Sequence, residues 1–149
     1  MGIPERWARH RPLPQDIELR LEAIIPIFEK QGVLLAYLFG SLSGKGENPP
    51  RPPGDVDLAV LTRDGPAYIL QDALIDALGT DRLDLVDLRK ASPVLRFEIL
   101  RTGLPIYVLD EKIQERYEVD TIHVYRDTAP MRRRHMEYME RRMAERCLE

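Results

Sequence analysis

An unbroken apolar segment, VLLAYLF, occupies residues 33–39 between Gly32 and Gly40. A continuous apolar run of this length, bounded by glycines, is typical of a strand that is buried on both faces. Such a strand needs other elements packed on each side of its sheet. The segment therefore predicts an α/β fold.

Helical and strand patterns alternate on either side of this segment. Apolar residues at helical spacing predict helices over residues 15–30, 67–78 and 92–103. Pro26 is expected to break the first helix, because proline lacks a backbone donor and clashes with the preceding turn. Shorter apolar runs predict strands at residues 55–61, 82–88 and 104–109. The charged remainder from Asp110 is expected to be helical, with an interruption around residues 127–130.

The composition suits one soluble domain in the cytoplasm. The 149 residues are 44% hydrophobic, which is enough for a core, and no apolar stretch approaches the ~20 residues of a membrane span. The net charge of −3 argues against a dedicated nucleic-acid binder. A single cysteine, Cys147, excludes an internal disulfide and a cysteine-rich zinc site. Residues 1–14, rich in proline and arginine, are expected to be a poorly ordered lead-in.

Gly40 and Ser41 directly follow the predicted buried strand. Glycine lets the backbone turn sharply and approach a phosphate, while a serine hydroxyl and exposed N–H groups can donate to phosphate oxygens. A Gly-Ser pair by itself is more often a simple turn. Its interpretation as a phosphate site depends on the residues that come next in the chain.

Two aspartates open the next predicted strand. Because strand side chains alternate between faces, Asp55 and Asp57 should point the same way, while Val56 and Leu58 point into the core. Two carboxylates on one face are suitable ligands for a hard cation such as Mg²⁺. Alone, this pattern is also typical of a solvated strand edge. Following a Gly-Ser pair and a glycine-rich loop, it favours metal-dependent nucleotide chemistry.

A third carboxylate is expected from the strand at residues 82–88. Asp84 and Asp87 lie three residues apart, so they face opposite sides and only one can join the first pair. Periodicity does not choose between them. Three histidines, at positions 10, 123 and 135, lie in the lead-in and the tail, where surface roles are more common than catalytic ones.

These motifs resemble those of the minimal nucleotidyltransferases of the DNA polymerase beta superfamily. The resemblance covers residues 15–110 and rests on LFGS at 38–41, GDVDLAV at 54–60, LDLVDL at 83–88 and the helix at 92–103. It implies a small mixed sheet flanked by helices, with the nucleotide and Mg²⁺ at the edge of the sheet. Residues 111–149 would form a charged helical extension.

The resemblance also implies roles for individual residues. Gly40, Ser41 and Lys45 would bind the nucleotide phosphates. Three carboxylates would ligate the metal ions and carry catalysis: Asp55, Asp57 and, as the third, Asp84. The chain departs from the family in its long loop between Ser41 and Asp55, in Lys45 where arginine is common, and in Gly54 where serine is common.

Small proteins of this family resemble the antitoxins of modules whose toxin is a HEPN-domain ribonuclease. The resemblance implies ATP as the AMP donor, a tyrosine of the partner toxin as the acceptor, and no direct contact with nucleic acid or membrane. A non-catalytic antitoxin and a small-molecule nucleotidyltransferase are the alternatives. The arginine- and methionine-rich tail at residues 131–149 is either a solvated helix or a helix that docks the partner.

Overall fold

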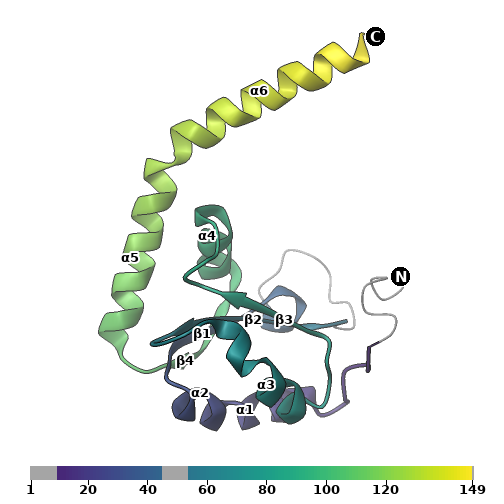
Figure 1. Ribbon diagram of the computed structural model, residues 1–149, viewed down its shortest axis with the longest axis vertical. Coiled ribbons are helices and arrows are strands. Elements are labelled where there is room, and N and C mark those ends of the chain that lie inside the picture. The colour runs from purple at the N-terminus through teal and green to yellow at the C-terminus, as the bar shows by residue number, and fades with distance from the viewer. Residues whose placement is uncertain (1–9, 45–53, 149) are drawn as a thin grey trace.

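The computed structural model describes residues 10–44 and 54–148, which form one four-stranded sheet with helices on both faces (Figure 1). The strands are β1 (Val33–Phe39), β2 (Val56–Thr62), β3 (Leu83–Asp87) and β4 (Leu104–Val108). The helices are α1 (Ile17–Ala23), α2 (Ile25–Lys30), η2 (Gly40–Ser43), η3 (Ala67–Leu70), α3 (Gln71–Leu78), α4 (Pro93–Thr102), α5 (Glu111–Asp127) and α6 (Ala129–Cys147).

The sheet is mixed and has the strand order β3-β2-β1-β4. Strand β1 pairs antiparallel with both β2 and β4, whereas β2 and β3 run parallel. The carboxyl end of β1 therefore lies beside the amino ends of β2 and β3. The predicted class, a small mixed α/β sheet flanked by helices, is confirmed.

Each face of the sheet has its own apolar core. On one face, Phe28 of α2 and Leu74 of α3 pack against Val56 and Leu58 of β2, and all four are buried. On the other face, the core contains buried Leu35, Tyr37, Ala59, Leu88 and Ile99. This second face is covered by α4 and α5 (Figure 1). β1 is thus buried on both faces, as its unbroken apolar sequence predicts.

Two predicted helix boundaries have clear physical causes. The helix predicted at residues 15–30 is broken at Ile24, and Pro26 lies in the first turn of α2, where no intrahelical donor is needed. Ser92 caps α4, because its hydroxyl oxygen accepts a hydrogen bond from the Leu95 N–H at 3.2 Å. The helix predicted at residues 67–78 begins with the 3₁₀ turn η3.

The described part of the N-terminal lead-in is attached to the segment before β3. The Arg11 N–H donates to Asp81 Oδ1 at 2.8 Å, and the Thr80 hydroxyl donates to the Arg11 carbonyl at 2.7 Å. The Arg82 guanidinium donates to the His10 carbonyl at 3.1 Å. The hydrogen bond from the Arg11 backbone holds the pKa of Asp81 below its usual value.

Two tyrosine hydroxyls attach α5 to the sheet and to the residue after β3. Tyr37 donates to Glu118 Oε1 at 2.8 Å, and Tyr117 donates to the Leu88 carbonyl at 3.0 Å. Burial raises the pKa of Tyr117 to about 12, and burial together with Glu118 raises the pKa of Tyr37 further. Both hydroxyls thus stay protonated donors at neutral pH. None of the described helices has the length and hydrophobicity of a membrane span.

Candidate active site

Gly40 turns the chain where β1 ends. It has a left-handed φ of +71° and begins η2, which runs to Ser43. The Ser43 hydroxyl donates back to the Gly40 carbonyl at 2.8 Å, which closes this short turn. Ser41 is exposed. The turn presents Gly40 and Ser41 at the carboxyl end of the buried strand, where the sequence predicts a phosphate site.

Asp57 lies directly against Gly40. Phe39 pairs with Asp57 across the antiparallel strands, and a Cβ atom built on Gly40 would lie 2.2 Å from Asp57 Oδ2. That separation is far shorter than any real non-bonded contact. Gly40 is therefore needed for two reasons, since both its backbone conformation and the Asp57 carboxylate exclude a side chain.

Asp84 is the cross-strand neighbour of Asp57 in the parallel ladder between β2 and β3. Paired residues in adjacent strands share a face of the sheet, so both carboxylates lie on the face covered by α4 and α5. Val56 and Leu58 are buried in the opposite core, as predicted. Asp55 is partly buried and lies immediately before β2.

The family described as polymerase beta, nucleotidyltransferase matches residues 22–112, a range that contains Gly40, Asp57 and Asp84. The chain belongs to this nucleotidyltransferase family. No curated protein sequence matches it significantly.

Solved toxin–antitoxin structures are similar to this nucleotidyltransferase. The complex of an MNT antitoxin with the tri-AMPylated HEPN toxin of Shewanella oneidensis matches with 28% identity and a TM-score of 0.66, over 83% of this chain and 98% of that chain. A toxin–antitoxin structure with AMP-PNP has 28% identity and a TM-score of 0.66, over 80% and 98% of the two chains. An MntA–HepT mutant, in which two aspartates separated by one residue are changed to glutamate, has 28% identity and a TM-score of 0.65, also over 80% and 98%.

Asp87, the alternative third carboxylate of the nucleotidyltransferase, has a different environment. Its Oδ2 accepts a hydrogen bond from the Ala67 N–H at 3.1 Å, and its Oδ1 accepts one from the Arg89 N–H at 3.0 Å. Both oxygens thus stabilise backbone at the start of η3 and after β3. The structure places Asp84, rather than Asp87, in register with Asp57.

We expect Asp87→Ala to lower the free energy of unfolding by about 1–2 kcal/mol, because two backbone N–H groups lose a charged acceptor. Chemical denaturation measures this change, and Asp76→Ala, at an exposed position on α3, is the control. Asp84→Asn should instead abolish nucleotide transfer while the protein stays folded. If Asp87→Ala were inactive yet fully stable, the two aspartates would have the opposite roles.

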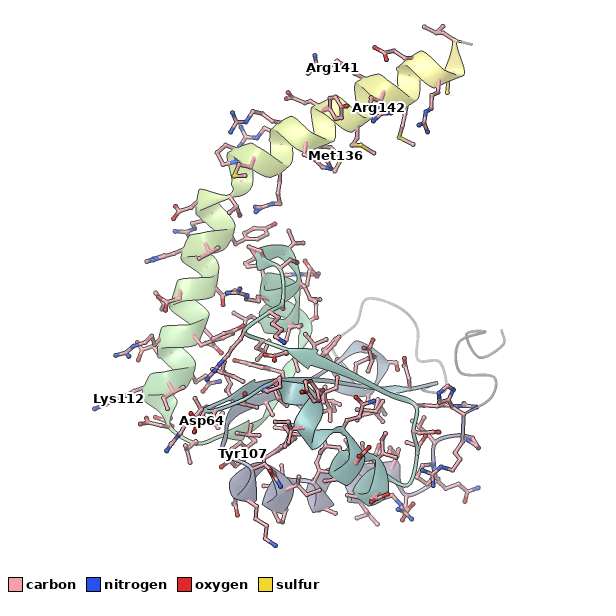
Figure 2. All side chains as sticks on the ribbon, in the orientation of Figure 1. Asp64, Tyr107, Lys112, Met136, Arg141 and Arg142 are labelled. Carbon is pink, nitrogen blue, oxygen red and sulfur yellow. The ribbon has the colours of Figure 1, made fainter. Side chains whose placement is uncertain are left out.

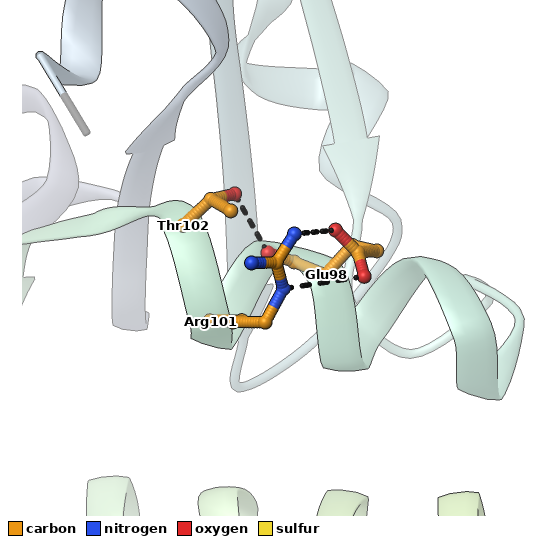
Figure 3. A network of polar contacts seen from close by, with 3 residues as sticks. All are labelled: Glu98, Arg101 and Thr102. Atoms are coloured by element: carbon orange, nitrogen blue, oxygen red, sulfur yellow. Dashed lines mark hydrogen bonds and ion pairs between the residues drawn. The ribbon is translucent and has the colours of Figure 1, made fainter. Parts of the chain in front are cut away.

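A charged pair that sequence patterns did not single out lies in the last turns of α4, near the carboxyl end of β1. Arg101 Nη2 and Glu98 Oε2 are 2.8 Å apart, and the Thr102 hydroxyl donates to the Glu98 carbonyl at 2.7 Å (Figure 3). Leu104, two residues after Thr102, pairs with Leu38 in the sheet. The i,i+3 spacing of Glu98 and Arg101 was the available signal, but it does not reveal that the helix ends beside β1.

The donor set of the nucleotidyltransferase site suits a hard divalent cation. Asp57 and Asp84 supply carboxylate oxygens on one face of the sheet, and the absence of a side chain at Gly40 lets the Asp57 carboxylate lie directly against the turn after β1. Within the described residues, no group of three or more His, Cys, Asp or Glu side chains is arranged to hold a metal ion by itself. Lys45, the predicted phosphate ligand, lies outside the described residues.

Proposed function

We propose that this nucleotidyltransferase transfers AMP from ATP to a tyrosine hydroxyl of a HEPN-type toxin and thereby acts as its antitoxin. The observation that carries the proposal is the position of Asp57, which lies between Gly40 on one side and Asp84 on the other. It is supported by the similar complex that contains a tri-AMPylated HEPN toxin, and by the similar structure with AMP-PNP.

The residues divide the chemistry between them. Gly40 allows close approach of the triphosphate, and Ser41 with the adjacent backbone N–H groups donates to its oxygens. Asp55, Asp57 and Asp84 would hold Mg²⁺, which neutralises charge on the phosphates and aligns them when it is bound. Phosphate oxygens of the nucleotide would supply further ligands to the Mg²⁺ held by these carboxylates. Lys45 would add a positive charge beside the phosphates.

The transfer step forms one P–O bond and breaks another. The tyrosine oxygen attacks the α-phosphorus of ATP. The bond between the α-phosphorus and the oxygen that bridges it to the β-phosphorus breaks, and pyrophosphate leaves. A tyrosine hydroxyl has an ordinary pKa of about 10, so it must lose its proton to a neighbouring base. The Asp84 carboxylate, on the face shared with Asp57, would orient this hydroxyl and accept the proton.

The test incubates the full chain with labelled ATP, Mg²⁺ and the HEPN-type protein encoded by the neighbouring gene. The expected result is label on that protein, an increase in its mass by whole AMP units at a tyrosine, and loss of both when EDTA is added. Protection of cells by an Asp55→Ala/Asp57→Ala double variant would instead support a non-catalytic antitoxin. Transfer to a soluble alcohol with no protein acceptor present would support a small-molecule enzyme.

A further inference from the structure

Helix α6 extends away from the sheet as an arm (Figure 1). Its 19 residues span about 28 Å, and none of them is buried. In proteins most helical stability comes from packing of an amphipathic face rather than from propensity. Because α6 buries none of its residues on its own domain, its apolar side chains are exposed for contact with another molecule.

The two sides of α6 have different chemistry. Arg133, Glu137, Arg141 and Glu145 follow one another at i,i+4 spacing, which gives an alternating charged face suited to solvent. The other side carries what we name the methionine stripe: Met136, Met139 and Met143, with exposed fractions of 61%, 41% and 63%. At about 100° per residue the centres of the two sets lie about 150° apart around the helix, with Arg133 at the edge nearest Met136. Figure 2 shows Met136 and Arg141 projecting in different directions.

A stack of three side chains fixes the direction of the arm. The Arg132 guanidinium lies 4.0 Å from the centroid of the Tyr125 ring, and its Nη2 donates to the Tyr125 carbonyl at 2.8 Å. Phe97 of α4 stacks on the other face of the Tyr125 ring. The two ring centroids are 4.0 Å apart, and the angle between the ring planes is 10°. The stack joins α4, α5 and α6 at the bend around Thr128.

The same stack shows which way the methionine stripe faces. Met136 and Met139 follow Arg132 by four and seven residues, so they share its side of the helix. Arg132 points back to α5 and α4, and the stripe therefore lies on the inner side of the bend (Figure 2). Helices α4 and α5 cover the sheet face that carries Asp57 and Asp84. The stripe and these two carboxylates thus lie on the same side of the sheet.

Charge indicates the kind of surface that α6 would bind. The helix contains six arginines and three glutamates, a net charge of +3. The whole chain carries −3, so the rest of the chain carries −6. A basic helix with exposed methionines suits a protein groove that is apolar along its floor and acidic at its rim.

Two other occupants fit less well. Glu140 lies beside the stripe, and methionine offers no aromatic platform for bases, which disfavours RNA. In an antiparallel pair of α6 helices, the edge that carries Arg142 and Arg146 would meet the same edge of the second copy. Like charges would then oppose each other along the contact.

We propose that the methionine stripe of α6 docks the protein that receives AMP and holds its tyrosine over the active site. This inference rests on the proposed function, because it identifies the bound protein with the acceptor. Docking contributes to binding of the acceptor rather than to the chemical step. Loss of the stripe therefore raises the KM for the acceptor and leaves kcat at saturation unchanged.

The test compares two triple variants of the full chain. Met136→Gln/Met139→Gln/Met143→Gln removes the stripe, and Glu137→Gln/Arg141→Gln/Glu145→Gln changes the same number of residues on the charged face. Binding to the neighbouring-gene HEPN-type protein is measured by calorimetry, and transfer by label incorporation. We expect the stripe variant to bind at least about tenfold more weakly, and the charged-face variant to bind like wild type. Circular dichroism checks that both keep their helix content.

The remaining outcomes would either refute the docking role of the methionine stripe or separate it from the proposed function. Equal binding by both variants would refute the docking role, while label on the acceptor would leave the proposed function standing. Tight stripe-dependent binding without any AMP transfer by wild type would refute the proposed function and the identification of the partner as acceptor. A stripe-dependent dimer in sedimentation, or stripe-dependent binding of labelled RNA with normal toxin binding, would assign the stripe to a different occupant.

Discussion

Asp57→Asn is expected to lower the rate of AMP transfer by about 10³-fold or more while the protein stays folded. The substitution keeps the size of the side chain beside Gly40 but removes the charge that would hold Mg²⁺. Asparagine is nearly isosteric with aspartate, so circular dichroism should show native helix content, while label incorporation into the acceptor falls.

Asp64→Asn is the matched control for this prediction. Asp64 is exposed in the turn after β2, at the other end of the strand that carries Asp57 (Figure 2). It should keep normal transfer, because the same change of charge is made far from Gly40. Similar losses in both variants would mean that net charge, rather than the position of Asp57, sets the rate. Full activity of Asp57→Asn would exclude Asp57 from catalysis.

The elements near the active site were predictable because their causes are local. The glycine-bounded apolar run from Val33 to Phe39 favours a strand covered on both faces, and the structure has it there. Pro26 interrupts the first helical pattern for a reason that depends only on its own ring. Ser92 accepts a hydrogen bond at the start of α4, as expected of a capping residue followed by proline.

The choice between Asp84 and Asp87 was not predictable from periodicity. Alternation shows that they face opposite sides, but not which side faces Asp57. That depends on the register between β2 and β3, which pairs residues 27 positions apart in the chain. The two N–H groups that bind Asp87 come from segments on either side of β3, and no local pattern indicates this contact.

The Phe97–Tyr125–Arg132 stack was also beyond sequence reasoning. An interruption near residues 127–130 was expected and is found at Thr128, but the angle of the bend depends on side chains from three helices. Each of these residues looks ordinary in its own helical pattern. Only the packing of α4 against α5 brings Phe97 and Tyr125 together. The direction in which α6 presents its methionines therefore follows from tertiary structure.

Gly40→Ala is expected to lower transfer by about 10²-fold, because the new Cβ would force the Asp57 carboxylate to move. The two atoms would otherwise be 2.2 Å apart, and a displacement near 1 Å at a reacting centre costs about 10²-fold in rate. The variant also bears the cost of a left-handed backbone at φ +71°, about 1–2 kcal/mol for a residue with a side chain. A loss of activity by itself would therefore not distinguish the contact from the backbone strain.

Gly32→Ala separates these two effects. Gly32 has nearly the same φ, +70°, at the opposite end of β1, and its added Cβ would meet only Arg63 Cβ at an ordinary 3.9 Å. Both variants should lose similar stability in chemical denaturation, but only Gly40→Ala should lose activity. If Gly32→Ala lost as much activity, the effect would arise from destabilised β1 as a whole. If neither variant lost activity, the triphosphate would not approach the chain at Gly40. The contact between Gly40 and Asp57 would then serve only to terminate the strand.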